Sequence, residues 1–541
     1  MRLSSELLLF GLVTAINADV VGKRATSTVP DYFQTSYGPY AGPTEAGQPP
    51  FLAQANPATL GNRNYVPNTP VVTAVPIVGC SDGAEVFKHM GNLSPYMPNP
   101  SGFGVEEFPL PAGTNITQMH MVHRHGSRYP TSSASVATLP NRIADLLGNG
   151  TRFLGDLAFL NSWTYQLGKE ELTALGRQQL FDSGVLNYFN YGRLYDGSKK
   201  LIARTTTQVR MLQSAENFLS GFFGPDWTKN VTLEVMIEEY GFNNSLAGDK
   251  ECTNSKNGRS DAGDDASSQW QEIYLKRATD RFRRSMTGNP NWTTADTYNA
   301  QTMCPYETVG LGYSPFCSLF TWDEWLGFEY SLDLSYYGGN GFGSPTGRAV
   351  GVGYVEELLA RLQQQGPPSG ENNVAFNETL DSNPSTFPLD QTLYLDFSHD
   401  TVIMSMLTAM GLTQFGQFLP PTGPPPDRQL IVSHIVPFAG RFNIEVIKAP
   451  RPVRVRRSQD PHKPAYESEG HETTYIHMLM NQRTIPLGHS IPECGQRDDG
   501  WCELKTFIKA QKENVAKAKY AESCFGNYSA PAYGDITTGA I

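Results

Sequence analysis

The sequence predicts an α/β fold in which a doubly wound sheet forms the core and a mainly helical cap domain is inserted into it. Three segments repeat one pattern, a short apolar strand followed by a polar turn and an amphipathic helix, which is typical of such sheets. A length of 541 residues is long for one domain and leaves room for the insertion.

The first two segments have basic side chains where their strands end. The first strand covers residues 116–123 and is followed by Arg124-His125-Gly126, with a helix expected over residues 142–147. The second strand covers residues 201–203 and is followed by Arg204, before a helix with apolar side chains along one face.

The third segment carries a histidine and a carboxylate at the corresponding position. Its strand, residues 393–397, alternates apolar side chains and is followed by Ser398-His399-Asp400. A helix over residues 402–410 comes next, and Gly411 can terminate it. Ligands of open α/β sheets bind beyond the carboxyl ends of the strands, so we expect the three turns to form one site.

Composition divides the remainder of the chain. Residues 25–75 contain only three charged side chains among many Pro, Thr, Gly and Asn residues, which is typical of an extended arm. We expect the arm to wrap over the body or to contact a second copy in a homo-oligomer. The expected divisions are a signal peptide (1–18), a short propeptide (19–24), the N-terminal arm (25–104), the catalytic core (105–150, 196–244 and 386–530) and the cap (151–195 and 245–385).

The N-terminus predicts secretion. A basic start at Arg2, a short apolar stretch and a small residue at Ala18 are typical of a secretory signal peptide, and Lys23-Arg24 resembles a processing site. We therefore expect a secreted or extracellular glycoprotein, with the cell wall or a vacuole as alternative destinations. Glycosylation sequons occur at Asn92, Asn115, Asn149, Asn230, Asn243, Asn291, Asn377 and Asn527.

Seven cysteines in an oxidising compartment predict three disulfides and one remaining thiol. The pairs Cys494–Cys502 and Cys304–Cys317 are near enough in sequence to close small loops, and Cys252–Cys524 is left as a long-range pair. Cys80 is the expected free thiol. A zinc site is disfavoured because the sequence contains no Cys-x-x-Cys pair.

Charge and hydropathy exclude two classes of partner. The formal net charge is −11, which disfavours binding to nucleic acid. Away from the N-terminus the sequence contains no run of 18 or more apolar residues, so no membrane span is expected. We expect a small-molecule substrate.

The first turn has the charges of an anion-binding site. His125 lies between Arg124 and Arg128, and burying two guanidiniums in a core without an anion would be costly. Arginine matches the geometry of phosphate oxygens, and we assign phosphate binding to these two residues and to Arg204. The surrounding positive charge disfavours the imidazolium form of His125, so we assign His125 as the nucleophile.

The third turn supplies the remaining groups. His399 is expected to donate a hydrogen bond to the same phosphate, and Asp400 to protonate the leaving alkoxide as a general acid. The alternative role for Asp400 is to cap the helix that follows, because it stands where an N-cap belongs. The arginine cluster favours the catalytic role.

The chain resembles the histidine acid phosphatases, and within them the secreted fungal acid phosphatases and phytases. The resemblance rests on the turns at 124–130 (RHGSRYP) and 398–400 (SHD). Similar blocks extend it over most of residues 110–525, namely EYGFNNSLAGDKEC (239–252), SPFCSLFTWDEW (314–325), GVGYVEELLARL (351–362) and NQRTIPL (481–487).

This resemblance implies the histidine phosphatase (phosphoglycerate-mutase-like) fold and a phosphohistidine intermediate, with no cofactor. It gives His125 the role of nucleophile, Asp400 that of proton donor, and phosphate binding to Arg124, Arg128, Arg204 and His399. Arg204 is preferred to Arg210 because it ends the strand, whereas Arg210 falls inside the helix. The three cysteine pairings also resemble those of the family.

Three alternatives of other classes are weaker. A zinc site formed by His120, His123 and His125 is opposed by the neighbouring arginines. A phosphoglycerate-mutase-like activity would be cytosolic, against the signal peptide and the sequons. An inactive surface-binding glycoprotein would not be expected to keep all six site residues.

Substrate preference is predicted from the residues after the first turn. A pocket for a highly phosphorylated inositol should carry extra lysines, yet residues 131–143 contain none and only Arg142 is basic. We therefore expect broad specificity for phosphate monoesters, phytate included, with a dedicated phytase (myo-inositol hexakisphosphate phosphohydrolase) as the alternative.

Overall fold

The computed structural model describes residues 73–541 except 84, 368–374 and 461–462. The expected signal peptide, the propeptide and most of the N-terminal arm therefore lie outside the described residues. Within the part that is described, no helix is both long enough and apolar enough to cross a membrane.

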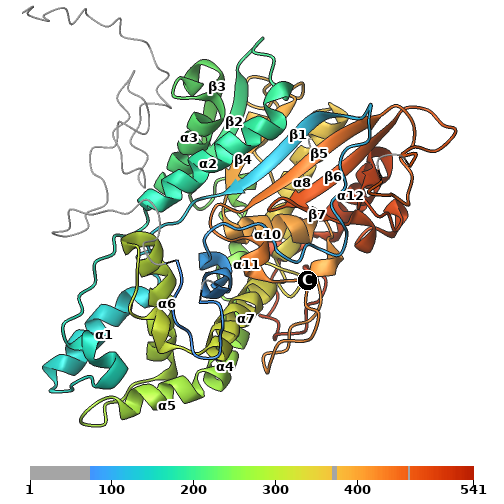
Figure 1. Cartoon of the computed structure of the whole chain (residues 1–541). Helices are drawn as coiled ribbons and strands as arrows, with labels where there is room; N and C mark the ends of the chain where they lie inside the picture. Colours follow the sequence, from blue (N-terminus) through green and yellow to red (C-terminus); the bar gives the residue numbers. More distant parts are fainter. Residues whose placement is uncertain (1–72, 84, 368–374, 461–462) are drawn as a thin grey trace, which may run out of the picture.

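Eight strands form one mixed sheet in the order β3-β2-β4-β1-β5-β6-β7, with β8 beside β6 (Figure 1). The first four of these strands are parallel neighbours, whereas β5 runs antiparallel to β1 and the pairs that follow are antiparallel as well. The strands are β1 (Asn115–Arg124), β2 (Leu201–Thr206), β3 (Val231–Met236), β4 (Leu393–Ser398), β5 (Arg441–Ala449), β6 (Thr473–Met480), β7 (Arg483–Ile485) and β8 (Cys502–Glu503).

Helices cover both faces of the sheet, which confirms the doubly wound α/β core. On one face, Met119 and Met121 of β1 pack with α2 (Ala174–Tyr191) and α3 (Val209–Phe223). On the other face, Val122 packs into a cluster formed with α8 (Gly347–Gln363), α10 (Asp400–Ala409) and α12 (Leu504–Lys517). The second half of the central strand β1, from Met119 to Arg124, is thus buried from both sides.

A separate helical region lies beside the carboxyl ends of the parallel strands (Figure 1). Its apolar cluster includes Ile143, Phe282, Trp292 and Trp325, all at most 2% exposed. The helices of this cap are α1 (Leu139–Gly148), α4 (Ala262–Tyr274), α5 (Lys276–Arg284), α6 (Thr294–Leu311) and α7 (Trp322–Gly339). Elsewhere in the described residues lie three short helices, α9 (Glu378–Asp381), α11 (Val432–Ile435) and α13 (Tyr520–Phe525).

The packing divides core and cap differently from the expected boundaries. Helix α1 was expected in the core, but its apolar face joins the cap cluster. Helices α2 and α8 were expected in the cap, but they pack on opposite faces of the sheet. The reason is physical, because the position of an apolar face, and not proximity in sequence to a strand, decides where a helix packs.

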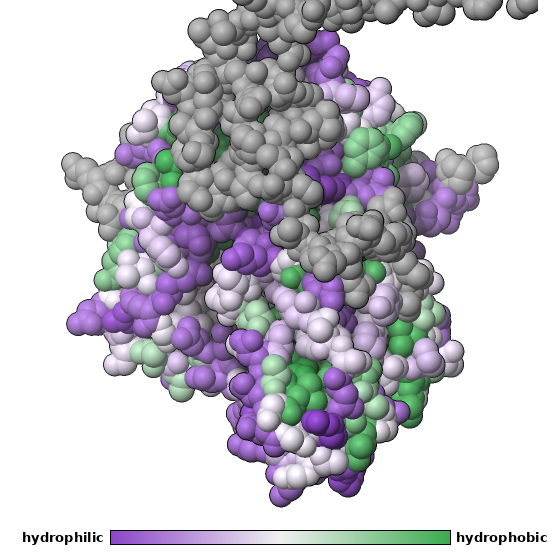
Figure 2. All heavy atoms as spheres, turned by 90° about the vertical axis from the view of Figure 1, so that its left-hand side faces the viewer, coloured by the Kyte–Doolittle hydropathy of each residue, from purple (hydrophilic) through white to green (hydrophobic). Residues whose placement is uncertain are grey.

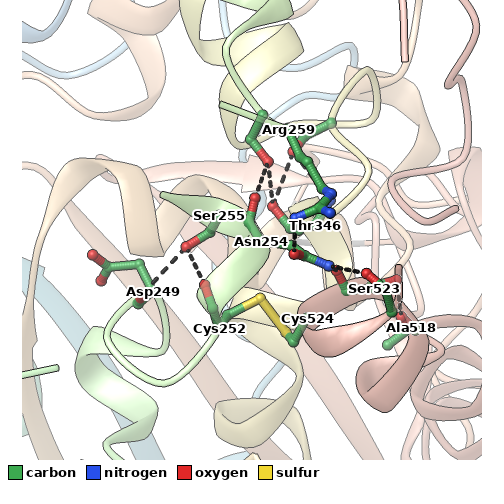
Figure 3. Close-up of a disulfide and its surroundings, with 12 residues drawn as sticks. Asp249, Cys252, Asn254, Ser255, Arg259, Thr346, Ala518, Ser523 and Cys524 are labelled. Carbon is green, nitrogen blue, oxygen red and sulfur yellow. Dashed lines mark hydrogen bonds between the residues drawn. A yellow bond between two sulfur atoms is a disulfide. The ribbon is translucent and has the colours of Figure 1, made fainter. Parts of the chain in front are cut away.

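The structure contains the three disulfides expected from the sequence, Cys252–Cys524, Cys304–Cys317 and Cys494–Cys502. Figure 3 shows the long-range pair, where the side chain of Asn254 also donates hydrogen bonds to the carbonyls of Ser523 and Gly526 at 3.1 and 2.9 Å. Cys80 is a free, half-buried thiol. The C-terminal segment is therefore fixed to the loop that leads into the cap.

The face on the left of Figure 1 is mainly polar. Figure 2 shows that the hydrophobic side chains visible on this face gather in small patches with polar surface between them, some of them at the lower end, where the cap lies. Such a distribution is ordinary for a globular protein surface.

Candidate active site

The turns after β1 and β4 lie side by side. The two strands are parallel neighbours, and Arg124 is paired in register with Ser398. His125 therefore comes close to His399, with 5.7 Å between the ring centroids. The meeting of these two turns beyond the carboxyl ends of the strands is the arrangement expected for a ligand site of an open α/β sheet.

Two glycines allow the first turn to approach α2. A Cβ atom on Gly126 would collide with the carbonyl oxygen of Gly176, and one on Gly176 would collide with the carbonyl oxygen of Ser127. The backbone of Thr173, at the start of α2, donates to the same Ser127 oxygen at 2.9 Å. The glycine of the Arg-His-Gly motif is thus required by close backbone contact.

The surroundings of His125 favour its neutral form. Its side chain is buried, and Nδ1 lies 2.9 Å from the carbonyl oxygen of Gly126, so a proton on Nδ1 leaves Nε2 with a free lone pair. Burial and four positive groups lower its pKa well below 6.5. These groups are Arg124, Arg128, Arg210 and His399.

Asp400 is paired with Arg124. The two side chains form an ion pair of 2.6 Å between Oδ2 and Nη2, and Asn92 donates to the same Oδ2 at 2.9 Å. Burial alone would raise the pKa of Asp400, but Arg124 and the hydrogen bonds from Asn92 and Tyr336 lower it well below its ordinary value. A bound phosphate dianion would compete for Arg124 and oppose this lowering, which favours protonation of Asp400 when substrate is present.

Asn92 does not suit glycosylation, contrary to its sequon. Its backbone carbonyl accepts from Arg124 Nη1 at 2.5 Å, and its side-chain amide is the group that contacts Asp400. A glycan on this amide would occupy the active site. Among the other sequons, Asn115, Asn149, Asn291 and Asn527 are exposed, and Asn230, Asn243 and Asn377 are half-buried.

Arg204 does not reach the phosphate site, which corrects its assignment. Strand β2 continues to Thr206, so Arg204 lies within the sheet, paired in register with Asp396 of β4. Its guanidinium is buried in ion pairs with Asp396 at 2.7 Å and Glu357 at 2.6 Å, and Arg361 pairs with Asp396 as well. Arg204 therefore belongs to a structural network of buried charges.

Arg210 takes the place that was assigned to Arg204. It stands in the first turn of α3, faces the site, and lowers the pKa of His125. Burial and the charge of Arg128 lower its own pKa to about 10, and Glu170 pairs with it at 3.1 Å. The signal in the sequence is that α3 begins so soon after β2 that its first turn meets the carboxyl end of the sheet.

The two arginines should respond oppositely to substitution. We expect Arg204→Ala to lower the free energy of unfolding by about 3–5 kcal/mol, because it removes the arginine paired with buried Glu357 and one of the two arginines paired with buried Asp396. Arg210→Ala should leave stability nearly unchanged but lower kcat/KM by about 10²–10³-fold, because it removes a donor for the transferring phosphoryl group. Thermal unfolding and steady-state kinetics on both variants test this, and the reverse pattern would restore the original assignment.

The cap contributes two tyrosines to the site. Tyr306 of α6 and Tyr336 of α7 both lie close enough to Arg124 and Arg128 to act to raise the pKa of these arginines. Tyr336 is also hydrogen-bonded to Asp400. The site is therefore completed by core and cap together. No short sequence motif marked these tyrosines, because only the packing of α6 and α7 brings them to the turns.

The three histidines of the alternative zinc site do not converge. His120 stacks on Tyr394 with 4.7 Å between ring centroids. His123 is bonded through its two nitrogens to the carbonyl of Arg124 and to Ser183, each at 2.7 Å. Of the three histidines, only His125 faces Arg124, Arg128 and Arg210.

A doubly wound sheet with a neutral histidine among arginines at its carboxyl edge defines a phosphatase of the histidine class. The family model described as "Histidine phosphatase superfamily (branch 2)" matches residues 115–481, and the chain belongs to this family. The predicted family and enzyme class are therefore confirmed, and the protein is a phosphoric monoester hydrolase of the histidine acid phosphatase type.

Relatives and solved structures agree with this assignment. The chain is 33% identical to Phytase A of Emericella nidulans over 78% of this chain and 88% of the relative, and 31% identical to Phytase A of Aspergillus oryzae over 80% and 90%. Its fold is similar to that of the phytase from D. castellii (TM-score 0.63, 24% identity, 84% and 93% covered). It is also similar to that of the multiple inositol polyphosphate phosphatase of Bifidobacterium longum (TM-score 0.53, 15% identity, 77% and 96% covered).

Proposed function

We propose that this enzyme is a secreted acid phosphatase that transfers the phosphoryl group of a monoester to His125 and then to water. The observation that carries the proposal is the buried His125 among Arg124, Arg128, Arg210 and His399. Four positive groups around one neutral imidazole provide both an anion site and a nucleophile within it.

The first step forms a bond between His125 Nε2 and phosphorus and breaks the bond between phosphorus and the ester oxygen. Asp400 gives its proton to that oxygen, so that an alcohol leaves. The arginines and His399 stabilise the negative charge on the three phosphoryl oxygens during the transfer.

In the second step water attacks the phosphohistidine. Asp400, now a carboxylate, accepts a proton from the water as the new bond to phosphorus forms and the bond to His125 Nε2 breaks. Inorganic phosphate leaves, and both side chains return to their initial protonation states.

The direction of the pH dependence follows from the two groups. His125 stays neutral at acidic pH because its pKa is lowered, so acid does not remove the nucleophile. Asp400 must be protonated for the first step, and protonation becomes rarer as the pH rises. Activity should therefore be greatest in acid and fall toward neutral pH.

We propose broad specificity that includes phytate. The four positive groups that lower the pKa of His125 serve one phosphoryl group, and Glu170 and Glu238 place negative charge beside Arg210. That composition suits monoesters with little additional charge. The names of the relatives, Phytase A, support the alternative of a dedicated phytase.

The ratio of kcat/KM on phytate to kcat/KM on a simple alkyl phosphate tests the two alternatives. For a broad enzyme we expect values within about tenfold of each other, since a difference of about 1.4 kcal/mol in transition-state binding gives that ratio. A preference for phytate of a hundredfold or more would establish the dedicated phytase. The two kcat/KM values should be compared at several acidic pH values, so that a difference in the ionisation of the two substrates is not mistaken for a substrate preference.

The compartment is part of the proposal. Three disulfides and several exposed sequon asparagines support passage through an oxidising secretory pathway. We propose release to the outside of the cell, with retention in the wall or delivery to a vacuole as alternatives. Immunoblotting of medium, wall and vacuolar fractions, with and without deglycosylation, distinguishes these destinations.

A further inference from the structure

Glu238 lies two residues beyond β3 and is buried at 6% exposure against the second histidine of the site. Its Oε2 is 2.9 Å from His399 Nε2 and accepts a hydrogen bond of 2.6 Å from the Thr206 hydroxyl. Its Oε1 accepts from the Gln208 side-chain amide at 2.5 Å and lies 3.7 Å from Lys250 Nζ. Donors from three separate segments therefore fix one carboxylate in one orientation.

This contact decides which nitrogen of His399 can act on substrate. Nε2 is committed to Glu238, so Nδ1 is the atom that remains for a phosphoryl group bound at His125, whose ring is 5.7 Å away between centroids. A neutral ring with its proton on Nε2 could only accept at Nδ1. To donate to a phosphate oxygen from Nδ1, His399 must carry both protons.

We infer that Glu238 is a positioning residue for phosphoryl transfer: its carboxylate accepts a hydrogen bond from His399 Nε2 and fixes the ring, so that Nδ1 faces the transferring group. The inference rests on the proposed function, because it requires His399 to bind phosphate. It adds a second carboxylate to a reaction otherwise described by His125, Asp400 and the arginines.

The charges around the pair support an anionic Glu238. Burial alone would raise its pKa, but His399, the hydrogen bonds from His399 and Thr206, and Lys250 lower it to about 2. Arg210 also faces this carboxylate, and Asp400 follows His399 directly in the chain. Glu238 consequently remains ionised through the acidic range and can keep accepting the hydrogen bond from His399.

Glu238→Gln is the direct test, with Glu239→Gln as the matched control because Glu239 is adjacent and exposed. We expect Glu238→Gln to lower kcat/KM by about 10–100-fold, as loss of an outer partner of a functional histidine does at metal sites. Inhibition by inorganic phosphate should weaken as well, because the His399 ring is no longer held against the phosphate site. Glu239→Gln should match the wild type.

Two further variants separate the outcomes. Glu238→Asp keeps the negative charge and should restore part of kcat/KM and of the inhibition by inorganic phosphate. In a His399→Ala background, Glu238→Gln should cause little additional loss, because both substitutions remove the same interaction.

Three results would overturn the inference: unchanged kinetics in Glu238→Gln, a loss of kcat/KM with unchanged inhibition by phosphate and a lowered melting temperature, or full additivity with His399→Ala. A His399→Ala variant of wild-type activity would instead contradict the proposed phosphate-binding role of His399. Failure of the inference and failure of the proposed function are therefore distinguishable.

Discussion

His125→Ala is expected to lower the turnover of phosphate monoesters by about four orders of magnitude or more, because removal of a nucleophile eliminates the covalent route. The three arginines and His399 remain, so the variant should still bind inorganic phosphate. The fold should also persist, because the β1–β4 pairing does not depend on the imidazole.

Three measurements check this expectation: kcat on an alkyl phosphate, phosphate binding by calorimetry, and the melting temperature. Retained activity in a pure, folded His125→Ala preparation would show that the phosphoryl group does not pass through His125. Loss of activity accompanied by loss of the folded state would leave the chemistry undecided, and in that case His125→Asn, which is closer in size and polarity, should give the same kinetic loss in a folded protein.

Asp400→Asn is expected to lower turnover of an alkyl phosphate by about 10²–10⁴-fold, the usual contribution of a general acid. With p-nitrophenyl phosphate the loss should be much smaller, because p-nitrophenolate leaves without a proton. The substitution also removes the anion that pairs with Arg124, but that effect acts on both substrates. The ratio of the two losses therefore isolates proton donation.

Steady-state kcat for both substrates, measured in wild type and variant across acidic pH, gives this ratio. Equal losses for the alkyl and nitrophenyl esters would mean that Asp400 acts only through Arg124. A leaving-group dependence that steepens in the variant would identify Asp400 as the acid.

The sequence predicts most of the framework because the framework depends on local patterns. Three repeats of strand, turn and helix were sufficient to predict the α/β core with strands β1, β2 and β4 and to bring His125 next to His399 and Asp400, whereas β3 and the antiparallel strands β5 to β8 were not predicted. The cysteine spacings likewise indicate the disulfides. The three strands and the two disulfides that close small loops depend on the order of residues within short segments, which a sequence displays directly.

The errors arise where tertiary packing decides. Arg204 looked like a strand end, yet β2 continues through Thr206 because Thr205 and Thr206 remain paired with Val235 and Met236 of β3. Arg210 was set aside as a helical residue, although the first turn of a helix at this edge of a sheet faces ligands. The sequence around Asn92 displays a sequon, but its contact with Asp400 joins residues 308 positions apart.

Glu238 could not be singled out for the same reason. Its neighbour Glu239 is of the same type, and only the turn after β3 points one of them toward His399 and leaves the other exposed. A charge pattern along the chain cannot show which of two adjacent glutamates has a functional role, whereas the structure shows that Glu238 is buried and Glu239 is exposed.

The central position of β1 has a consequence for biosynthesis. This strand, which leads directly to His125, lies between β4, which begins at Leu393, and β5, which begins at Arg441. While the cap is being synthesised, His125 lacks the neighbouring strands β4 and β5, and Asp400 has not yet been added to the chain. Such pairing between distant segments forms late. The nascent chain should therefore be inactive until β4 and β5 have been synthesised, and the Cys252–Cys524 disulfide can form only after Cys524 has been added.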